Sequence, residues 1–542
     1  MKPASLQLGL VAAGCVLIAL AALAGSPRAA SGADGATVLR VAMSSDVDYV
    51  DPGLDYLSTG WEIQYATACK LLNYADKDGS QGSQLVPEVA GFPHISKDGK
   101  TYTFVVRKGF RFANGEPVTA QSFALAFNRD ANPSFQSPAQ AFIQDIIGAN
   151  AVTRGLSRSI AGIAVRGDTI SFSLVAPAPD FLSRLAMPFF QALPRSFARK
   201  VDPSGVNVIP SCGPYWIASR MPNKSIILKR NPYYRGSRPH NAAEIYYTIG
   251  NTQQVNEQDV LSGVVDYAAD GFPPADAKML AQKLGVNRGQ FFIRLRLGLR
   301  YLALNHDRPL FKNNPQLAKA LNYAVDRSAI LQQAGFRAGE EIDHILPPAL
   351  SGSRPCNCYS STPDFSKAKD LAKGNTRSGT ATLWIANRGS GPLQAQVIQY
   401  DLAKIGLDVN VQSFSRPVQI ARESTRGAPF DLTLEGWVAD YADPYDFINV
   451  LLSGDVIRKT NNNNVAYFDD PGYNRKMADA ARLIGAKRYS TYASLDLEMM
   501  RDNPPWVPLY SVTDRILVAK RVGCFTFNPV FGTDLAALCP HA

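Results

Sequence analysis

Two clusters of aspartates are the residues of this sequence whose type and spacing are suited to chemistry. They are Asp46, Asp48, Asp51 and Asp55 near the N-terminus, and Asp440, Asp443 and Asp446 toward the C-terminus. A pair of acids can act as general acid and base in glycoside hydrolysis. A single acid removed from water can instead hold an ammonium group through a charge-assisted hydrogen bond. Spacing along the chain does not separate these two interpretations.

The signatures of other enzyme classes are missing from the sequence. It contains neither a Gly-x-Ser-x-Gly nucleophile elbow nor a glycine loop of the kind that cradles nucleotide phosphates. The five histidines show no partner pattern in the sequence, and they are His94, His240, His306, His344 and His541. We therefore expect structural roles for the histidines, no catalytic residue and no cofactor.

The cysteines favour disulfides. They are Cys15, Cys69, Cys212, Cys356, Cys358, Cys524 and Cys539. In an exported protein the even number after Cys15 predicts disulfide bonds, although the sequence leaves most of the pairing open. We expect Cys524 to pair with Cys539, because that bond would pin the C-terminal tail. No metal site is expected at Cys356 and Cys358, since no further ligands lie at a zinc-binding spacing.

The first thirty residues are typical of an export signal. Lys2 gives a positive start, and an apolar run follows from Leu6 to Leu23. We expect a signal peptide at 1–30 and a mature protein that is periplasmic or exposed on the cell surface. An uncleaved anchor is the alternative, because about 18 apolar residues are enough to cross a bilayer. Lipoprotein anchoring at Cys15 is not expected, since the apolar run continues beyond it.

Size and charge narrow the class further. A chain of 542 residues, 46% of them hydrophobic, exceeds what one hydrophobic core usually serves and predicts two or more lobes. The net charge is +10, but the basic residues are scattered rather than gathered along one element. We therefore expect no nucleic-acid partner.

Strands and helices alternate along the chain, which predicts an α/β fold. We expect strands at 38–43, 101–107 and 170–175, helices at 61–72, 120–129 and 139–147, and further helices after Asn314-Pro315 and Asp470-Pro471. The segment from about 75 to 210 carries both kinds of element, so we expect it to be a mixed insertion.

The clearest local unit lies between residues 380 and 414. A strand at 381–385 is followed by Gly391-Pro392, which opens a helix that carries Leu393, Val397 and Tyr400 on one face. The helix ends at Gly406, and an alternating strand follows. This pattern predicts a βαβ unit with a parallel strand pair. Open α/β sheets bind ligands at the carboxyl ends of their strands, so we expect a cleft between two lobes.

Eleven short motifs, in order along the chain, resemble those of one family. They are Asp51-Pro52, 98–104, 107–112, 115–120, Cys212-Gly213-Pro214-Tyr215, Asn231-Pro232-Tyr233-Tyr234, 301–305, 320–327, 436–444 and 468–471, with Pro505-Trp506-Val507-Pro508-Leu509-Tyr510 after them. Together they resemble the dipeptide- and oligopeptide-binding proteins of bacterial ABC importers, the family 5 extracellular solute-binding proteins. The chain departs from some oligopeptide receptors of the family at Leu434, where they carry an Arg that grips a peptide carboxylate.

The resemblance implies a two-lobed type 2 periplasmic-binding-protein fold of the α/β class with an extra subdomain in lobe one. The implied boundaries are 37–75 and 211–295 for lobe I, 76–210 for the extra subdomain, 296–509 for lobe II and 510–542 for the return to lobe I.

The resemblance also implies the binding residues. Asp440 would pair with a ligand α-ammonium, while Gly436, Trp437 and Val438 would pair with the ligand backbone. Trp437 and Tyr441 would supply flat walls or pack in the core. The candidate set is completed by Tyr56 and Ser58.

The function implied is a receptor that captures peptide-like ligands and delivers them to the transmembrane subunits of an ABC permease. We expect a monomer that catalyses no reaction. Two alternatives remain open: the same fold binding another solute, such as a metal chelate, opine, glycoside or cationic amine, and a secreted hydrolase.

Overall fold

Two mixed β-sheets with helices packed on them frame the protein in this computed structural model, which describes residues 37–541 apart from residue 198. The α/β class predicted from the sequence is confirmed. The predicted signal peptide at 1–30 and Cys15 lie outside the described residues.

The first sheet has five strands in the order β11-β1-β10-β9-β8. These are β11 (Tyr267–Ala268), β1 (Val38–Met43), β10 (Glu244–Ile249), β9 (Ser225–Arg230) and β8 (Tyr215–Met221). β1 is parallel to both of its neighbours, β11 and β10. β9 is antiparallel to both of its neighbours, β10 and β8. The predicted strand at 38–43 is confirmed as β1, and its Leu39 and Val41 are buried in the core of this sheet.

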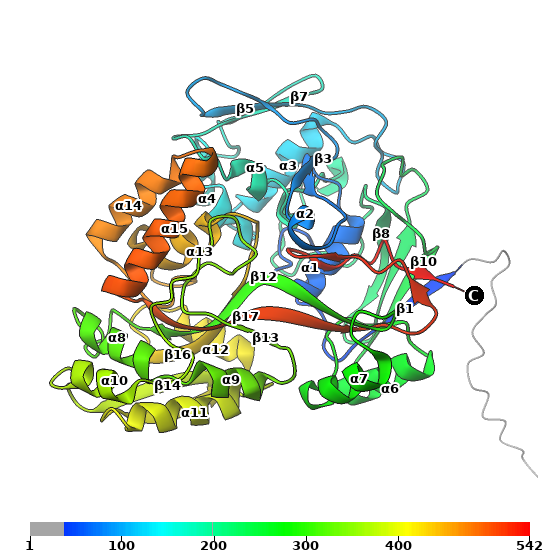
Figure 1. The fold of residues 1–542 in the computed structure, drawn as a ribbon. Helices are drawn as coiled ribbons and strands as arrows, with labels where there is room; N and C mark the ends of the chain where they lie inside the picture. The colour runs from blue at the N-terminus through cyan, green and yellow to red at the C-terminus, as the bar shows by residue number, and fades with distance from the viewer. Residues whose placement is uncertain (1–36, 198, 542) are drawn as a thin grey trace, which may run out of the picture. The chain divides into compact units, whose positions relative to one another are not determined.

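The second sheet has six strands in the order β13-β17-β12-β16-β14-β15. These are β13 (Gly339–Glu341), β17 (Trp506–Leu517), β12 (Phe291–Leu304), β16 (Leu432–Val438), β14 (Thr380–Ala386) and β15 (Asp408–Phe414). The long strands β12 and β17 run side by side across the middle of Figure 1 and pair antiparallel. Val518, just beyond β17, bridges to Tyr267 of the first sheet, so this ribbon connects the two sheets within one compact unit.

The predicted βαβ unit is confirmed, with one change of face. β14 and β15 are parallel, and α11 (Gly391–Ala403) connects them. The stripe expected on this helix does not face the core, because Leu393 is 49% and Tyr400 is 64% exposed. Ala395, Ile398 and Leu402 are buried instead, so the sheet packs against a different face of the helix from the one predicted.

The segment from 75 to 210 contains its own antiparallel sheet in the order β4-β5-β7-β6. Its elements are β4 (His94–Ile95), β5 (Thr101–Val105), β6 (Ile163–Arg166), β7 (Thr169–Ser173), α3 (Ala120–Asp130), α4 (Ala149–Thr153) and α5 (Phe181–Arg184). The predicted strands and the helix at 120–129 are confirmed. Thr119 and Ser122 cap α3 reciprocally, which gives Ser122 a structural role.

One helix prediction in the first half of the chain is wrong, and a second helix is displaced. No continuous helix spans 139–147, because a short 3-10 turn (Pro138–Phe142) ends at residue 142 and Gly148 adopts a left-handed φ of 85° before α4 begins. The helix expected at 61–72 is α1 (Ser58–Thr67), which starts and ends earlier. β2 (Leu72–Tyr74) follows it and pairs with β3 (Leu85–Pro87).

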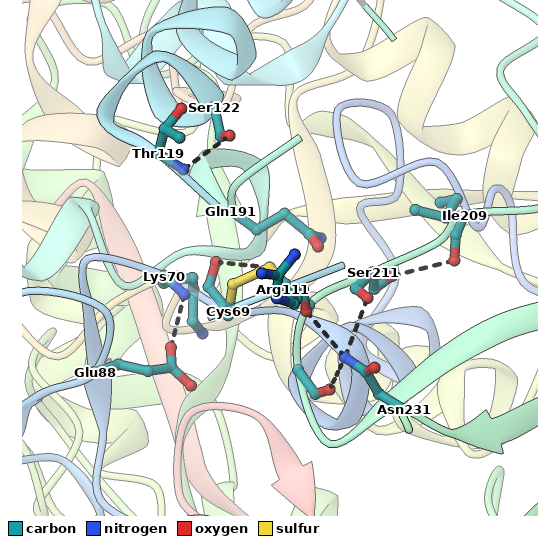
Figure 2. The surroundings of a disulfide bond; sticks show 12 residues. Cys69, Lys70, Glu88, Arg111, Thr119, Ser122, Gln191, Ile209, Ser211 and Asn231 are labelled. Carbon is teal, nitrogen blue, oxygen red and sulfur yellow. Dashed lines mark hydrogen bonds between the residues drawn. A yellow bond between two sulfur atoms is a disulfide. The ribbon is translucent and has the colours of Figure 1, made fainter. Parts of the chain in front are cut away.

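A disulfide fixes the chain where α1 ends. Cys69 is bonded to Cys212, and the backbone N–H of Gly213 donates to the carbonyl of Thr67. Figure 2 shows Asn231 beside this bond, where its amide donates to the carbonyls of Arg111 and Ser211 as well as Gly213. These tertiary contacts follow directly after Thr67. They end α1 earlier than the apolar periodicity of the sequence predicts.

The disulfide predicted between Cys524 and Cys539 is confirmed, and Cys356 is bonded to Cys358. The two short strands β18 (Val522–Gly523) and β21 (Cys539–Pro540) pair beside the Cys524 bond. The tail is therefore tied down as expected.

The further helices of the second half are α8 (Pro315–Ala324), α9 (Arg327–Ala334), α10 (Phe365–Ala372), α12 (Arg416–Glu423), α13 (Tyr445–Leu452), α14 (Pro471–Ala481) and α15 (Gly485–Asp502), while α6 (Gln253–Ser262) and α7 (Ala277–Leu284) belong to the first sheet. Of the helices in the second half, α8, α9 and α12 pack on the six-stranded sheet, α10 packs on α8, and α13, α14 and α15 pack on one another in chain order. The predicted helix starts after Asn314 and Asp470 are confirmed, because both side chains cap the first turn. Among the helices of the described chain, none has the length and apolar character needed to span a bilayer.

Candidate functional site

Residues of both sheets line a cleft. One cavity of about 350 Å³ is lined by Tyr56, Ser58 and Trp61 on the side of α1, and by the 436–440 segment at the end of β16. A second cavity of about 700 Å³ shares Ser58 and Val438 with the first and reaches Ser44 and Ser45, just after β1, and the start of α11. Because the two cavities share lining residues, we treat them as one space and call it the cleft.

Asp440 lies at the inner end of the cleft and is only 6% exposed. Its Oδ2 accepts a hydrogen bond of 2.7 Å from the hydroxyl of Tyr56. Its other oxygen, Oδ1, has no hydrogen-bond partner among the described residues. Asp440 thus keeps one carboxylate oxygen available to a donor that enters the cleft.

Burial changes the charge of this carboxyl. It raises the pKa of Asp440 to about 7, against the effect of the Tyr56 hydrogen bond. Asp446 lies behind it and accepts hydrogen bonds from the Asp440 backbone and the Trp437 indole, both at 3.0 Å. Burial and then the neighbouring Asp440 hold the pKa of Asp446 well above its usual range. Asp446 therefore positions the segment, while Asp440 is the acid that lines the cleft.

The strand before Asp440 has an open edge. β12 pairs with β16 along one side as far as Val438, but β14 pairs with the other side only at Leu432 and Thr433. The backbone of 434–438 is therefore unpaired by any strand on its β14 side. Such an edge can take an extended ligand as an added strand.

The structure brings most of the predicted residues together. Tyr56, Ser58, Gly436, Trp437, Val438 and Asp440 all line the cleft. Tyr441 does not, because it is fully buried, donates from its hydroxyl to Asp180 at 3.1 Å and packs edge-on against Phe142. Its observed contacts are those of a core residue.

A cluster of charges in the wall of the cleft was not predicted from the sequence. Arg416 binds both carboxylate oxygens of Glu435 and also contacts Glu423 at 3.4 Å. Burial would raise the pKa of Glu435, but Arg416 holds it below its usual range. Burial and the adjacent Glu435 hold the pKa of Glu423 well above its usual range. The cluster is therefore neutral when Glu423 keeps its proton.

Two further arginines were missed. Arg300 lies on β12 opposite Gly436, and Arg388 follows β14 just before α11. Both line the cleft. Arg388 could have been predicted from the sequence, because it follows the carboxyl end of β14, a parallel strand. α/β sheets bind ligands at such strand ends. Arg300 lies inside a strand and offered no such signal.

The first aspartate cluster does not contribute carboxylates to the cleft. Asp51 is bound at both oxygens by the buried Arg129, and Asp46 accepts from Arg220 at 3.1 Å. Asp55 accepts from Gln64 beneath α1. These acids hold the loop ahead of α1 in place, so they give no support to a glycosidase pair.

His344 has partners that the sequence did not reveal. Its ring lies 3.4 Å from Asp343 and 3.2 Å from the hydroxyl of Ser353. The Ser353 hydroxyl lies 2.9 Å from the carbonyl of Leu346 and donates to it, and His344 is only 5% exposed. Asp343 also lies near Cys356 and Cys358, but these sulfurs are bonded to each other and are not thiolate ligands. None of these residues lines the cleft.

Comparison with known proteins gives this geometry a family. A family model described as bacterial extracellular solute-binding proteins, family 5 middle, matches residues 84–458. The chain is 24% identical over 448 residues to the periplasmic oligopeptide-binding protein OppA of Escherichia coli K12, covering 80% of each protein.

Solved structures share the fold. The clavulanic acid biosynthesis oligopeptide binding protein 2 aligns with a TM-score of 0.83 at 22% identity, over 93% of this chain and 95% of that one. The periplasmic binding protein DppA from Helicobacter pylori, in complex with the peptide STSA, aligns with a TM-score of 0.77 at 21% identity, over 93% and 98%. These likenesses confirm the two-lobed fold. Since the family model spans more than half of the sequence, the chain belongs to family 5 of the bacterial extracellular solute-binding proteins.

Proposed function

We propose that the protein is an extracytoplasmic receptor that captures short peptides in the cleft and delivers them to the transmembrane subunits of an ABC importer. The observation that carries the proposal is Asp440, a buried acid with one free oxygen at the end of an open strand edge. The relatives support it, because they are named for oligopeptide binding or contain a bound peptide.

The bound ligand lies along β16. Its α-ammonium group donates to Asp440, and its backbone pairs with the open edge at Gly436 and Val438. Main-chain hydrogen bonds of this kind give affinity that does not depend on sequence. Trp437 and Trp61 form flat walls that accept varied side chains, and Tyr56 and Ser58 close the cleft from the side of α1.

The far end of the ligand lies toward Arg300 and Arg388. Leu434 leaves the position of the family's carboxylate-gripping Arg without a charge. Arg388 and Arg300 bring guanidinium groups to the same space from β14 and β12. We therefore assign recognition of the peptide carboxylate to one of these two residues.

Closure links binding to transport. A ligand that touches both sheets stabilises the closed arrangement of lobe I (37–75, 211–295 and 510–542, with the subdomain at 76–210) over lobe II (296–509). We propose that this closed form, a periplasmic or surface-exposed monomer, docks on the permease. The family consists of binding proteins, and we propose that this member catalyses no reaction.

Isothermal titration with di- to pentapeptides tests the proposal. We expect saturable binding of short peptides to the wild type and loss of binding for Asp440→Ala. Asp408→Asn, an exposed change on β15, is the matched control and should bind like the wild type. Failure of every peptide to bind the wild type, or undiminished binding by Asp440→Ala, would overturn the assignment.

A further inference from the structure

The larger cavity of the cleft has an excess of positive charge. It is lined by five arginines, Arg296, Arg300, Arg388, Arg416 and Arg515. Asp514 lies 2.7 Å from Arg296, and Glu435 takes up the charge of Arg416. Asp270 accepts from the backbone of Ser44. Glu62 also lines this space, but burial raises its pKa to about 8, so it is mostly neutral near pH 7.

Two of these guanidinium groups have neither a counter-ion nor a hydrogen-bond partner in the described part of the chain, and a third, that of Arg515, has no counter-ion. Among the described residues, neither Arg300 nor Arg388 forms an ion pair or a side-chain hydrogen bond. Arg300 lies against Gly436, whose position would bring a Cβ within 2.8 Å of the Arg300 Nη1. The pKa of Arg388 is lowered by burial and then by the nearby Arg416 and Arg300. Crowded like charges of this kind cost free energy that an anion would relieve.

Other donors border the same space. Ser390 stands at the start of α11, where its hydroxyl makes no capping bond, and Ser45 and Arg515 line the opposite wall. Arg515 donates only to the backbone carbonyls of Ala334 and Phe336. The arrangement offers more donors than the two oxygens of one carboxylate can accept.

We infer that the cleft is selective for ligands with a second acidic group next to the terminal carboxylate, such as a peptide that ends in Glu or Asp. The inference rests on the proposed function, since the peptide's own carboxylate accounts for one of the two unpaired charges. Arg300, which touches the strand edge at Gly436, and Arg388, at the end of β14, face the two acidic groups.

Titration with matched dipeptides tests this selectivity. We expect Ala-Glu to bind at least roughly tenfold more tightly than its neutral isostere Ala-Gln, because hydrogen bonds between charged groups are stronger than neutral ones. Arg300→Gln and Arg388→Gln should each reduce this ratio to about threefold or less. Arg426→Gln removes an exposed charge that pairs with Asp307 outside the cleft, and should leave the ratio unchanged. Ala-phosphoserine distinguishes a phosphate ligand from a carboxylate.

The outcomes separate the inference from the proposed function. If Ala-Gln binds as tightly as Ala-Glu and Ala-phosphoserine, the inference is overturned and peptide binding stands. If no dipeptide binds but glutarate does, and Arg300→Gln removes that binding, peptide binding is overturned and the acidic site stands. If neither dipeptides nor glutarate bind, both are overturned.

Discussion

Asp440 shows how a single carboxyl can be both buried and ready for a ligand. Tyr56 satisfies one oxygen at 2.7 Å, and no described residue satisfies the other. With a pKa of about 7, the empty site carries a full negative charge only part of the time near neutrality. An arriving ammonium group favours the ionised form, so ligand binding and proton release are linked.

Peptide affinity should therefore depend on pH. Below about pH 7 the proton competes with the ligand, and the affinity for Ala-Ala should fall roughly tenfold for each pH unit. Above about pH 8 the peptide amine loses its own proton and affinity should fall again. Titrations between pH 5.5 and about pH 7 measure this fall in affinity on the acid side. An affinity that stays constant from pH 5.5 to 7.5 would contradict the assignment of Asp440.

The sequence predicted the acidic residue of the cleft but not its arginines. Asp440 and Trp437 stand in a continuous motif, so their neighbourhood follows from chain order. Arg300 and Arg388 reach the cleft from different strands, and only the pairing of β12 with β16 brings Arg300 opposite Gly436. Tyr441 is adjacent to Asp440 in sequence, yet its side chain turns toward Asp180, because side chains at successive positions do not share one direction.

Among the elements, β12 most directly shapes the cleft. It pairs with β17 on one side and β16 on the other, and its register with β17 shifts between Leu295 and Leu299. Gly298 lies within this irregular stretch. A Cβ at Gly298 would sit 2.8 Å from the carbonyl oxygen of Trp437, so only glycine lets β16 approach this closely.

Gly298→Val should push β16 away from β12. We expect the free energy of unfolding to fall by about 1–3 kcal/mol and peptide affinity to fall with it, because Trp437 and Val438 would move. Urea unfolding and calorimetric titration measure the two effects. Gly91→Val is a control, since a Cβ at Gly91 meets no atom within 4 Å. Wild-type affinity in Gly298→Val would show that β12 does not set the cleft.

Local patterns predicted some elements and failed at others for physical reasons. The βαβ unit at 380–414 was predictable because strand alternation and the Pro near the first turn of α11 are local features. The error at 61–72 arose because the Cys69–Cys212 bond and the Gly213 contact to Thr67 end α1 early. On α11 two apolar faces compete, and only the sheet decides that Ile398 is buried while Tyr400 is exposed.

For the whole molecule, the segment that begins at Asp440 joins the two sides of the cleft. Asp440 accepts from Tyr56, Tyr441 donates to Asp180, and the backbone of Ala442 donates to the Tyr74 hydroxyl at 2.9 Å. All three partners come from residues that precede the second sheet in the chain. We therefore expect these bonds to favour the closed arrangement proposed above, even without a ligand.

Tyr441→Phe should weaken closure without touching the ligand. Loss of one hydrogen bond of about 1 kcal/mol should raise the radius of gyration of the ligand-free protein and weaken peptide binding about fivefold. Small-angle X-ray scattering and titration measure these effects. Tyr492→Phe removes a bond to Asn449 that does not cross the cleft, and should change neither quantity. An unchanged radius and affinity in Tyr441→Phe would argue against the role of this segment in closure.

A double-mutant cycle determines whether Asp440 holds the ligand's ammonium group. Ala-Ala and N-acetyl-Ala-Ala are each titrated into the wild type and Asp440→Asn. We predict that either change alone weakens binding by roughly 2 kcal/mol or more. The two changes made together should weaken binding by little more than either change alone. The difference corresponds to a coupling free energy of at least about 1.5 kcal/mol. A coupling near zero, with acetylation weakening both proteins equally, would contradict the account.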